Sequence, residues 1–300
     1  MFIVYLLMVV LLMFVLFYTG TLNKLAEITG YATSANTALN ISISNTAPTI
    51  GTVNVIAAQD PTDDTTTSIT FNYTVTDNDG AGNINLSEAK AYFNKTGETT
   101  RSNTTCINTS IGVGNNINFT CTISMYYFDV NGAWTINATI KDKSASYVEN
   151  STTTFTYNIL TAMKMAPTSL SWASIGVTTT DAGSSNDPII INNTGNDIPL
   201  DVNVTSYNLR GETTITEFIY GANFTVQNAS QGCSGTAMVN ATSTNITTST
   251  LQRGNHSLGY NNATSGQEEI FFCLKGVLST LSQQSYSSSA YGSWLVAVIT

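Results

Sequence analysis

The apolar run at the start of the chain constrains its fold more than any other feature. Residues 2–18 read FIVYLLMVVLLMFVLFY, and the first charged residue is Lys24. Seventeen apolar residues are at the lower limit for a helix that crosses a bilayer. A secretory signal peptide usually begins with Lys or Arg, but neither precedes this run. No small-x-small cleavage site follows the run either. We therefore expect a retained hydrophobic helix rather than a cleaved signal.

The residues after this run extend the helical pattern. Apolar residues recur at spacings of three and four, a heptad seam that predicts a helix continuing to about residue 39 with one face on a neighbour. No charged residue occurs between residues 28 and 59, which is typical of close packing against other chains rather than of a solvated linker. The residues expected to make these contacts are Ile3, Leu6, Val9, Val10, Met13, Leu16, Leu25, Ile28 and Leu39.

The charge content excludes several classes of partner. Only 10% of the residues are charged, against about 25% in an ordinary soluble domain. The net charge is -9 and the ten basic residues form no patch, so nothing would neutralise the phosphates of a nucleic acid or dock on an anionic membrane surface. The chain instead has 49 threonines, 30 serines and 32 asparagines, and its 42% hydrophobic content is enough to form cores.

Beyond residue 48 the spacing of apolar residues changes from a helical period to the two-residue period of a β-strand. Apolar and polar residues alternate in segments 68–76, 119–123, 134–140 and 200–204, and Asp-Gly and Asn-Gly turn signals separate such segments. This pattern predicts half-buried antiparallel strands in β-sandwiches. We expect a helix and linker over 1–47 and sandwiches over 48–160 and 161–300, joined at Thr161–Pro167. The last strand, Trp294–Ile299, is apolar throughout and suits pairing inside a sheet.

With these features the chain resembles an archaeal type IV pilin-like filament subunit. The resemblance covers residues 1 to about 45, in pattern only. It implies that the N-terminal helices bundle into a filament core after insertion in the cytoplasmic membrane, and that β-sandwich heads form the outer sheath. The fold class expected is mainly β with one long N-terminal α-helix and two tandem immunoglobulin-like β-sandwich domains.

The four cysteines fall two to each expected head. The domain boundary favours the pairs Cys106–Cys121 and Cys233–Cys273 among the three possible connectivities. Such pairs stay oxidised outside the cytosol. No Cys-x-x-Cys pair or flanking histidine supports a zinc site.

Asparagine sequons of the form Asn-x-Ser/Thr are about twice as frequent as the composition gives by chance. Several asparagines lie on the polar phase of a predicted strand, where a glycan could attach, although any polar residue on a strand tends to face out. We expect dense N-glycosylation, and heads stripped of glycans should aggregate. The seventeen sequons begin at Asn40, Asn72, Asn85, Asn94, Asn103, Asn108, Asn118, Asn137, Asn150, Asn192, Asn203, Asn223, Asn228, Asn240, Asn245, Asn255 and Asn262.

One segment matches part of a calcium-loop template. Residues 77–88 read DNDGAGNINLSE and place Asp77, Asp79 and Glu88 at loop positions 1, 3 and 12. The flanks are predicted strands rather than helices, so a polar β-turn is the competing interpretation. Acidic residues 60, 63 and 64 are further candidate ligands from a neighbouring loop.

No enzyme signature is evident. The single histidine, His256, lies in a loop, and Glu268 and Glu269 are adjacent on a predicted strand and so point to opposite faces. The sequence has no phosphate-binding glycine loop or nucleophile elbow. We predict a non-enzymatic structural subunit of an extracellular filament that assembles with itself and carries no cofactor beyond covalent glycans, with calcium as a candidate ion. The alternative is a single-pass, membrane-anchored surface adhesion protein whose heads bind a protein or carbohydrate.

Overall fold

The computed structural model describes residues 2–18, 39–111, 114–230, 232–254 and 266–300. It divides into two compact units, residues 1–44 and 45–300. The described chain is mainly β, with one N-terminal helix and several sheets.

Helix α1 (Phe2–Tyr18) contains the whole apolar run. It has no acidic residue in its first turn and no basic residue in its last turn, so neither end is stabilised by charge. Its side chains are exposed, except that of Leu16, which is half-buried. Leu39, expected near the end of a longer helix, lies outside any helix and is 82% exposed. The expected contact residues Leu25 and Ile28 lie outside the described residues.

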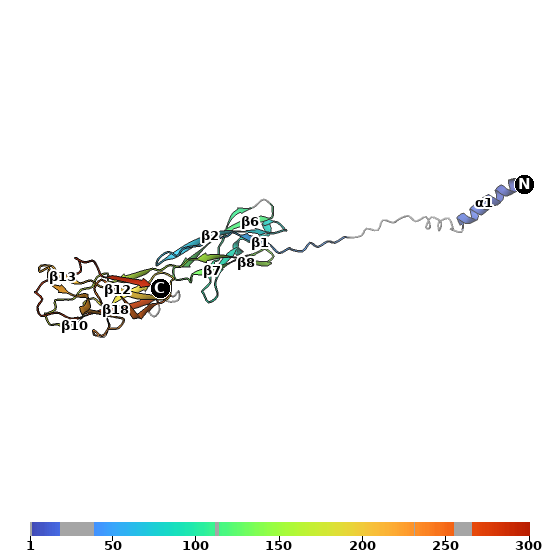
Figure 1. Cartoon of the computed structure of the whole chain (residues 1–300). Helices are drawn as coiled ribbons and strands as arrows, with labels where there is room; N and C mark the ends of the chain where they lie inside the picture. The colour runs from blue at the N-terminus through green and yellow to red at the C-terminus, as the bar shows by residue number, and fades with distance from the viewer. Residues whose placement is uncertain (1, 19–38, 112–113, 231, 255–265) are drawn as a thin grey trace. The chain divides into compact units, whose positions relative to one another are not determined.

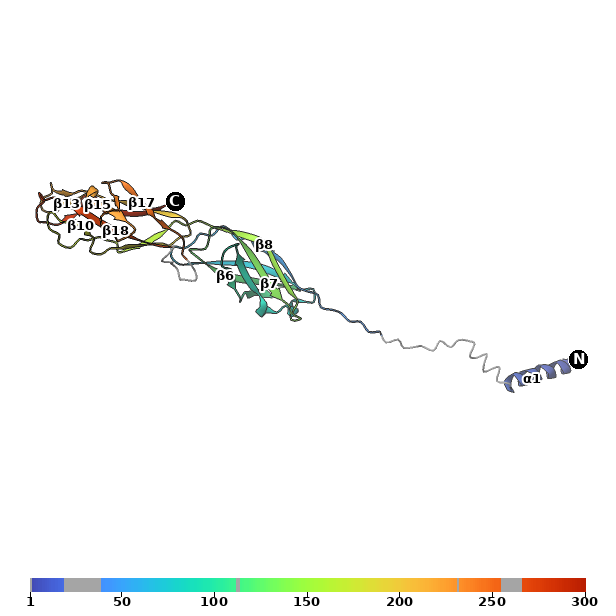
Figure 2. The same ribbon diagram turned by 90° about the horizontal axis from the view of Figure 1, so that it is seen from below.

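The first β region comprises residues 49–157. Its strands are β1 (Thr49–Val53), β2 (Thr66–Thr76), β3 (Lys90–Asn94), β4 (Arg101–Asn103), β5 (Ile107–Ile111), β6 (Asn116–Tyr126), β7 (Gly132–Lys141) and β8 (Tyr147–Tyr157), with short 3-10 helices η1 (Ala81–Asn83) and η2 (Leu86–Glu88). They form two four-stranded antiparallel sheets, ordered β1-β2-β6-β5 and β4-β3-β7-β8. β2 and β6 lie side by side in Figure 1, and β7 and β8 in Figure 2.

Alternation decides which side chains of these strands face inward. In β2, Phe71 and Tyr73 are buried while Asn72 between them is exposed. Tyr73 stacks on Phe119 of β6, with ring centroids 5.4 Å apart. Because successive side chains of a strand point to opposite faces, the apolar set of both sheets enters one shared core, which includes the fully buried Trp134 of β7.

The second β region comprises residues 163–299 and is built from shorter elements. These are β9 (Met163–Ala166), β10 (Thr180–Gly183), β11 (Ile189–Asn193), β12 (Leu200–Thr205), β13 (Leu209–Gly211), β14 (Phe218–Ile219), η3 (Gly221–Asn223), β15 (Phe224–Gln227), β16 (Thr236–Ala237), β17 (Ser243–Leu251), β18 (Gln267–Gly276), β19 (Tyr286–Ser287) and β20 (Leu295–Ile299). One sheet has the order β16-β15-β18-β11-β9, with β10 also paired to β18; two three-stranded sheets have the orders β17-β12-β20 and β14-β13-β19.

The second region has a separate hydrophobic core with a hollow beside it. Phe224 and Phe272 are buried, and Trp294 packs against both with ring centroids 5.0 and 6.0 Å away. Trp172 also packs against Phe224, with ring centroids 5.1 Å apart. A cavity of about 1050 Å³ adjoins these rings and is otherwise lined largely by serine-rich loops.

The segment expected to join the two regions, Thr161–Pro167, lies at the start of the second region. Segment Thr161–Pro167 is not a free linker, because it contains β9, which pairs with β11 of the second region. Side chains of the second region also form hydrogen bonds with residues of the first region and of the segment between them. Asn196 donates its side-chain amide to the backbone oxygens of Asp129 and Asn158, at 3.0 Å each. Arg253 donates to both carboxylate oxygens of Glu98, at 2.6 Å.

The last strand also departs from expectation. β20 pairs with β12 on one side, and the order β17-β12-β20 places it at the edge of its sheet rather than inside it. Figure 1 shows the C-terminus at the end of this strand, beside β12.

Candidate assembly, glycosylation and metal sites

The candidate assembly surface is the whole circumference of α1. The contact residues predicted within it, Ile3, Leu6, Val9, Val10 and Met13, are 46 to 74% exposed. The residues between them are also apolar and exposed, so the helix has no polar face. A helix that is hydrophobic all round belongs in the interior of a larger assembly or in lipid. The heptad seam predicted from the sequence therefore understates the apolar surface.

The described sequon asparagines all reach the surface. Asn40, Asn72, Asn118 and Asn240 are exposed, and the other eleven described ones are partly exposed. The two buried asparagines among the described residues, Asn193 and Asn196, are not the glycan-accepting asparagine of any sequon. The partly exposed ones are Asn85, Asn94, Asn103, Asn108, Asn137, Asn150, Asn192, Asn203, Asn223, Asn228 and Asn245, while Asn255 and Asn262 lie outside the described residues.

The hydrogen bonds of these asparagines show which of them have Nδ2 engaged, and Nδ2 is the amide nitrogen to which a glycan attaches. Asn150 donates Nδ2 to the backbone oxygens of Ile50 and Gly51, and Asn103 donates Nδ2 to that of Thr122. Asn72 accepts at its Oδ1 atom from the Thr120 hydroxyl, and Asn118 accepts at its Oδ1 atom from the Thr74 hydroxyl. Glycosylation at Asn72 and Asn118 therefore leaves these contacts intact.

Polar-phase placement does not make every strand asparagine fully accessible. Asn137 and Asn203 are only partly exposed, and the Oδ1 atom of each is buried without a hydrogen-bond partner in the described structure. Alternation alone does not reveal this burial.

The structure does not bring the candidate calcium ligands together. The carboxylates of Asp77, Asp79 and Glu88 form no group within 4.8 Å among the described residues. Asp77 is buried and accepts from the backbone N–H of Asp79 at 2.9 Å. Glu88 lies beside Lys90 and Lys141, whose ammonium groups are 3.3 and 3.6 Å away. The hydrogen bond and charge of Lys90, with the charge of Lys141, hold the pKa of Glu88 below its usual range.

The 77–83 loop instead holds the point where the chain enters the first β region. Asp79 accepts from the backbone N–H of Thr46 at 2.6 Å, and Asn83 donates to the Oδ1 atom of Asn45 at 3.0 Å. Asn45 in turn donates to Asp142 at 2.7 Å. Burial alone would raise the pKa of Asp142, but hydrogen bonds from Asn45 and Ser146 outweigh it and lower that pKa.

The other acidic candidates lie at the opposite end of β2. Asp60 accepts from Asn158 at 2.7 Å and Asp64 pairs with Lys164 at 2.5 Å, both beside the boundary between the two β regions. The eleven residues of β2 separate them from the 77–83 loop by about 35 Å. They cannot complete a cation site there.

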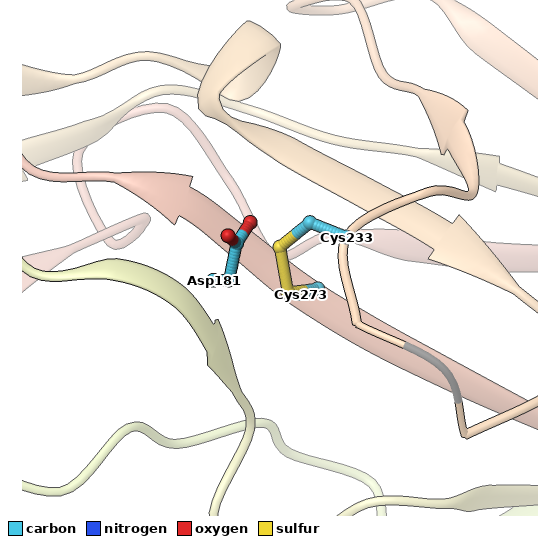
Figure 3. Close-up of side chains that lie close together, drawn as sticks. All are labelled: Asp181, Cys233 and Cys273. Atoms are coloured by element: carbon cyan, nitrogen blue, oxygen red, sulfur yellow. A yellow bond between two sulfur atoms is a disulfide. The ribbon is translucent and has the colours of Figure 1, made fainter.

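One acid-cysteine group is present among the described residues, formed by Asp181, Cys233 and Cys273 (Figure 3). The two sulfurs are joined in a disulfide, so they offer no thiolate to a metal. A second disulfide joins Cys106 to Cys121. Both pairs are the ones that the domain boundary favoured, and two disulfides indicate a secreted or surface protein rather than a cytosolic one.

Two carboxylates have structural partners that the sequence did not reveal. Glu217 accepts from Ser282, Gln284 and Tyr286, and these hydrogen bonds, led by that of Tyr286, lower its pKa to about 2. Asp187 is partly buried, which raises its pKa, although it accepts from the backbone N–H of Phe272. Each carboxylate fixes a loop to a distant part of the chain.

The two adjacent glutamates of β18 differ in exposure. Glu268 is partly buried and Glu269 is exposed on β18, and burial raises the pKa of Glu268. His256 lies outside the described residues. Within the described ranges, no helix is both long and apolar enough to cross a membrane.

Comparisons with known proteins give little further information. No family model matches the chain, and no curated protein matches it. Among solved structures, a secreted serine protease, VesC from Vibrio cholerae, is 13% identical with a TM-score of 0.21. The alignment covers 79% of this chain, which spans about half the length of that protein. This likeness is too distant to inform either the fold or the activity.

Proposed function

We propose that this protein is the structural subunit of an extracellular, pilus-like filament. The observation that carries the proposal is α1, a helix of seventeen apolar residues whose side chains are exposed on all sides. Fully burying a large apolar side chain stabilises by about 1.5 kcal/mol or more, so the helices of many copies gain strongly by packing together. The subunit resembles archaeal type IV pilins in this respect.

The β regions suit the role of heads on such a filament. Their sheets enclose two separate cores, which supports a reading as two tandem immunoglobulin-like sandwiches. Two disulfides, and surface-reaching asparagines in every described sequon, fit an extracellular glycoprotein. Glycans would supply the hydration that so few charged residues cannot. Low charge also limits repulsion between closely packed copies.

Charged substitutions in α1 test the assembly role. We expect Val9→Asp and Leu12→Lys each to abolish filaments, because a charge buried in a helix bundle has no partner. Electron microscopy of sheared cell-surface material measures the filaments, and tryptophan fluorescence with intact disulfides shows that the heads remain folded. Val55→Lys is the matched control, since Val55 is 84% exposed and lies outside every helix and strand. Filaments that persist in the α1 variants would refute the proposal.

The cavity of the second region favours one alternative, a membrane-anchored adhesion protein. Its lining combines the rings of Trp172 and Trp294 with serine hydroxyls, a mixture that suits a sugar. In that case detergent extraction of cells gives monomers rather than filaments. Trp172→Ala would then abolish binding to a glycan array while the disulfides remain intact.

Glycosylation is tested on the intact protein. We expect glycosidase treatment to lower the intact mass and to make the heads aggregate. An unchanged mass equal to that of the bare polypeptide would contradict dense glycosylation.

A further inference from the structure

Strand β20 has the composition of a central strand, although it lies at the edge of its sheet. Its five residues, LVAVI, include no polar side chain. Val296 and Val298 are buried or half-buried, whereas Leu295 and Ile299 are 57 and 43% exposed. Strands that are apolar on both faces normally lie inside covered sheets. An exposed apolar edge is a template for pairing with another chain.

The other edge strands of the described sheets lack this property. Each edge strand of three or more residues contains Thr, Ser, Asn, Glu, Asp or Lys, as in β1, β4, β5, β8, β9 and β17. Such polar residues discourage pairing with another chain. The edge of β20 is therefore the one among these where a further strand is favoured.

A second segment has the pattern of a strand but pairs with none. Residues 39–44 read LNISIS, with apolar and polar side chains in strict alternation. They lie outside every helix and strand, and Leu39, Ile41 and Ile43 are 82, 73 and 91% exposed. Strict alternation over six residues indicates a half-buried β-strand. Three exposed β-branched or large apolar side chains on one phase indicate that a partner sheet is missing.

We propose that residues 39–44 of one copy add as a strand to the free edge of β20 in a second copy. The apolar phase of the segment would then lie beside Val296 and Val298 and extend the second core. The polar phase, including Asn40 and Ser42, would face outward next to Ala297. Because Asn40 would lie on the outward face, a glycan on its side chain is compatible with this arrangement. The six residues of the segment match the five of β20 in length.

The chain's own β20 is out of reach of this segment. Asn45 is held beside Asp142 at the far end of β7, whereas Tyr157 pairs with Gly132 at the end nearest the second region. The ten residues of β7 span about 33 Å. Six extended residues cover about 20 Å, so residues 39–44 cannot lie along β20 of the same copy. The partner is therefore a second copy. This inference rests on the proposed function in one respect: the second copy is taken to be a neighbouring subunit of the same filament.

Two co-expressed full-length chains with different tags test the pairing. One chain carries Ser42→Cys and the other Ala297→Cys; the described cysteines are otherwise all in disulfides. Directly opposed residues of paired strands lie within the range of a disulfide, so we expect about tenfold more cross-linked heterodimer than in the control pair. That control pairs Ser42→Cys with Thr154→Cys, an exposed residue on edge strand β8. A Ser42→Ala chain, which also lacks the Asn40 sequon, controls for loss of that glycan when filaments are scored.

A charge on the strand segment provides the second measurement. We expect Ile41→Lys, added to the Ser42→Cys chain, to reduce the cross-link to the control level while the disulfides and tryptophan fluorescence stay unchanged. Filaments without the Ser42–Ala297 cross-link would overturn this inference and leave the filament proposal standing. A cross-link without filaments would support this inference and refute the filament proposal. Equal cross-linking at Ala297 and Thr154 would show nonspecific contact and also overturn the inference.

Discussion

In the first β region β2 pairs with β6 over eleven successive residues, whereas strands β13, β14, β16 and β19 of the second region have only two or three residues each. The first region fills the space between its sheets with buried rings, and the second leaves a cavity of about 1050 Å³ beside its rings. Long ladders hold the first core. In the second, side-chain anchors such as Glu217 and a disulfide that closes a longer loop take a larger part.

A matched pair of ring deletions gives the largest expected effect on this contrast. Phe93 and Phe224 are both fully buried, but only Phe224 lines the cavity. Phe93→Ala should destabilise the first region by about 4 kcal/mol, because it opens a void in a filled core. Phe224→Ala should cost the second region about 3 kcal/mol, because loops beside an existing cavity can collapse into the space.

The three tryptophans allow the two regions to be followed separately. Trp134 reports on the first region, and Trp172 and Trp294 report on the second. Denaturant titrations with single-tryptophan variants give the free energy of unfolding of each region. A larger loss from Phe224→Ala than from Phe93→Ala would break the contrast between a filled and a hollow core.

Removal of the disulfides should affect the second region more than the first. Cys233 and Cys273 are 40 residues apart, and Cys106 and Cys121 are 15 apart. Because a longer loop restricts the unfolded chain more, the paired Cys→Ala variants should lose about 4 and about 3 kcal/mol respectively. Thermal unfolding under oxidising conditions measures both losses. The reverse order would show that strain or residual structure outweighs loop length.

Arg253→Gln should uncouple the two regions at a smaller cost. Arg253 binds both carboxylate oxygens of Glu98 and also donates to the backbone oxygen of Phe128, at 3.2 Å. Loss of a bidentate, partly buried pair costs about 1 to 2 kcal/mol. We expect the unfolding midpoints reported by Trp134 and Trp294 to move apart. Arg210→Gln, on the short strand β13, is the control and should leave them unchanged.

The pH dependence of the second region should reveal the Glu217 anchor with the smallest effect. Its pKa in the folded protein is about 2, below the usual 4.5, so its contribution is complete above pH 4.5. That contribution is lost as the pH falls through the folded-state pKa. Thermal unfolding between pH 5 and pH 2 should show a steeper fall for the wild type than for Glu217→Gln. Equal pH dependence of the wild type and Glu217→Gln would contradict the stabilising role assigned to Glu217.

Alternation of apolar and polar residues predicted several strands from the sequence, although not β8 or β17, which have eleven and nine residues. Strands β2, β6 and β7 fall where this pattern placed them. Strands of two or three residues, such as β14 and β19, cannot show a period and were not foreseen. The edge position of β20 was also missed, because an apolar run does not distinguish a central strand from an edge that binds a partner.

The candidate sites show a similar limit. Division of the cysteines between two regions was enough to favour the observed disulfides. The 77–88 segment matched a calcium template by spacing, yet its acidic groups bind Asn83, Thr46 and two lysines. Thr46 lies 33 residues from Asp79 in the sequence and Lys141 lies on β7, and local spacing carries no information about either contact. Asn83 belongs to the segment itself, and Lys90 follows it on β3.

The placement of Asn45 and Tyr157 at opposite ends of the first β region has a mechanical consequence. A pull transmitted along the chain enters through β1 beside Thr76 and leaves through β8 beside Gly132. The load therefore acts along the strands, and the ladder hydrogen bonds share it in shear instead of opening one after another like a zipper. A subunit stretched in this direction should resist a tensile force far better than one pulled from two neighbouring strand ends.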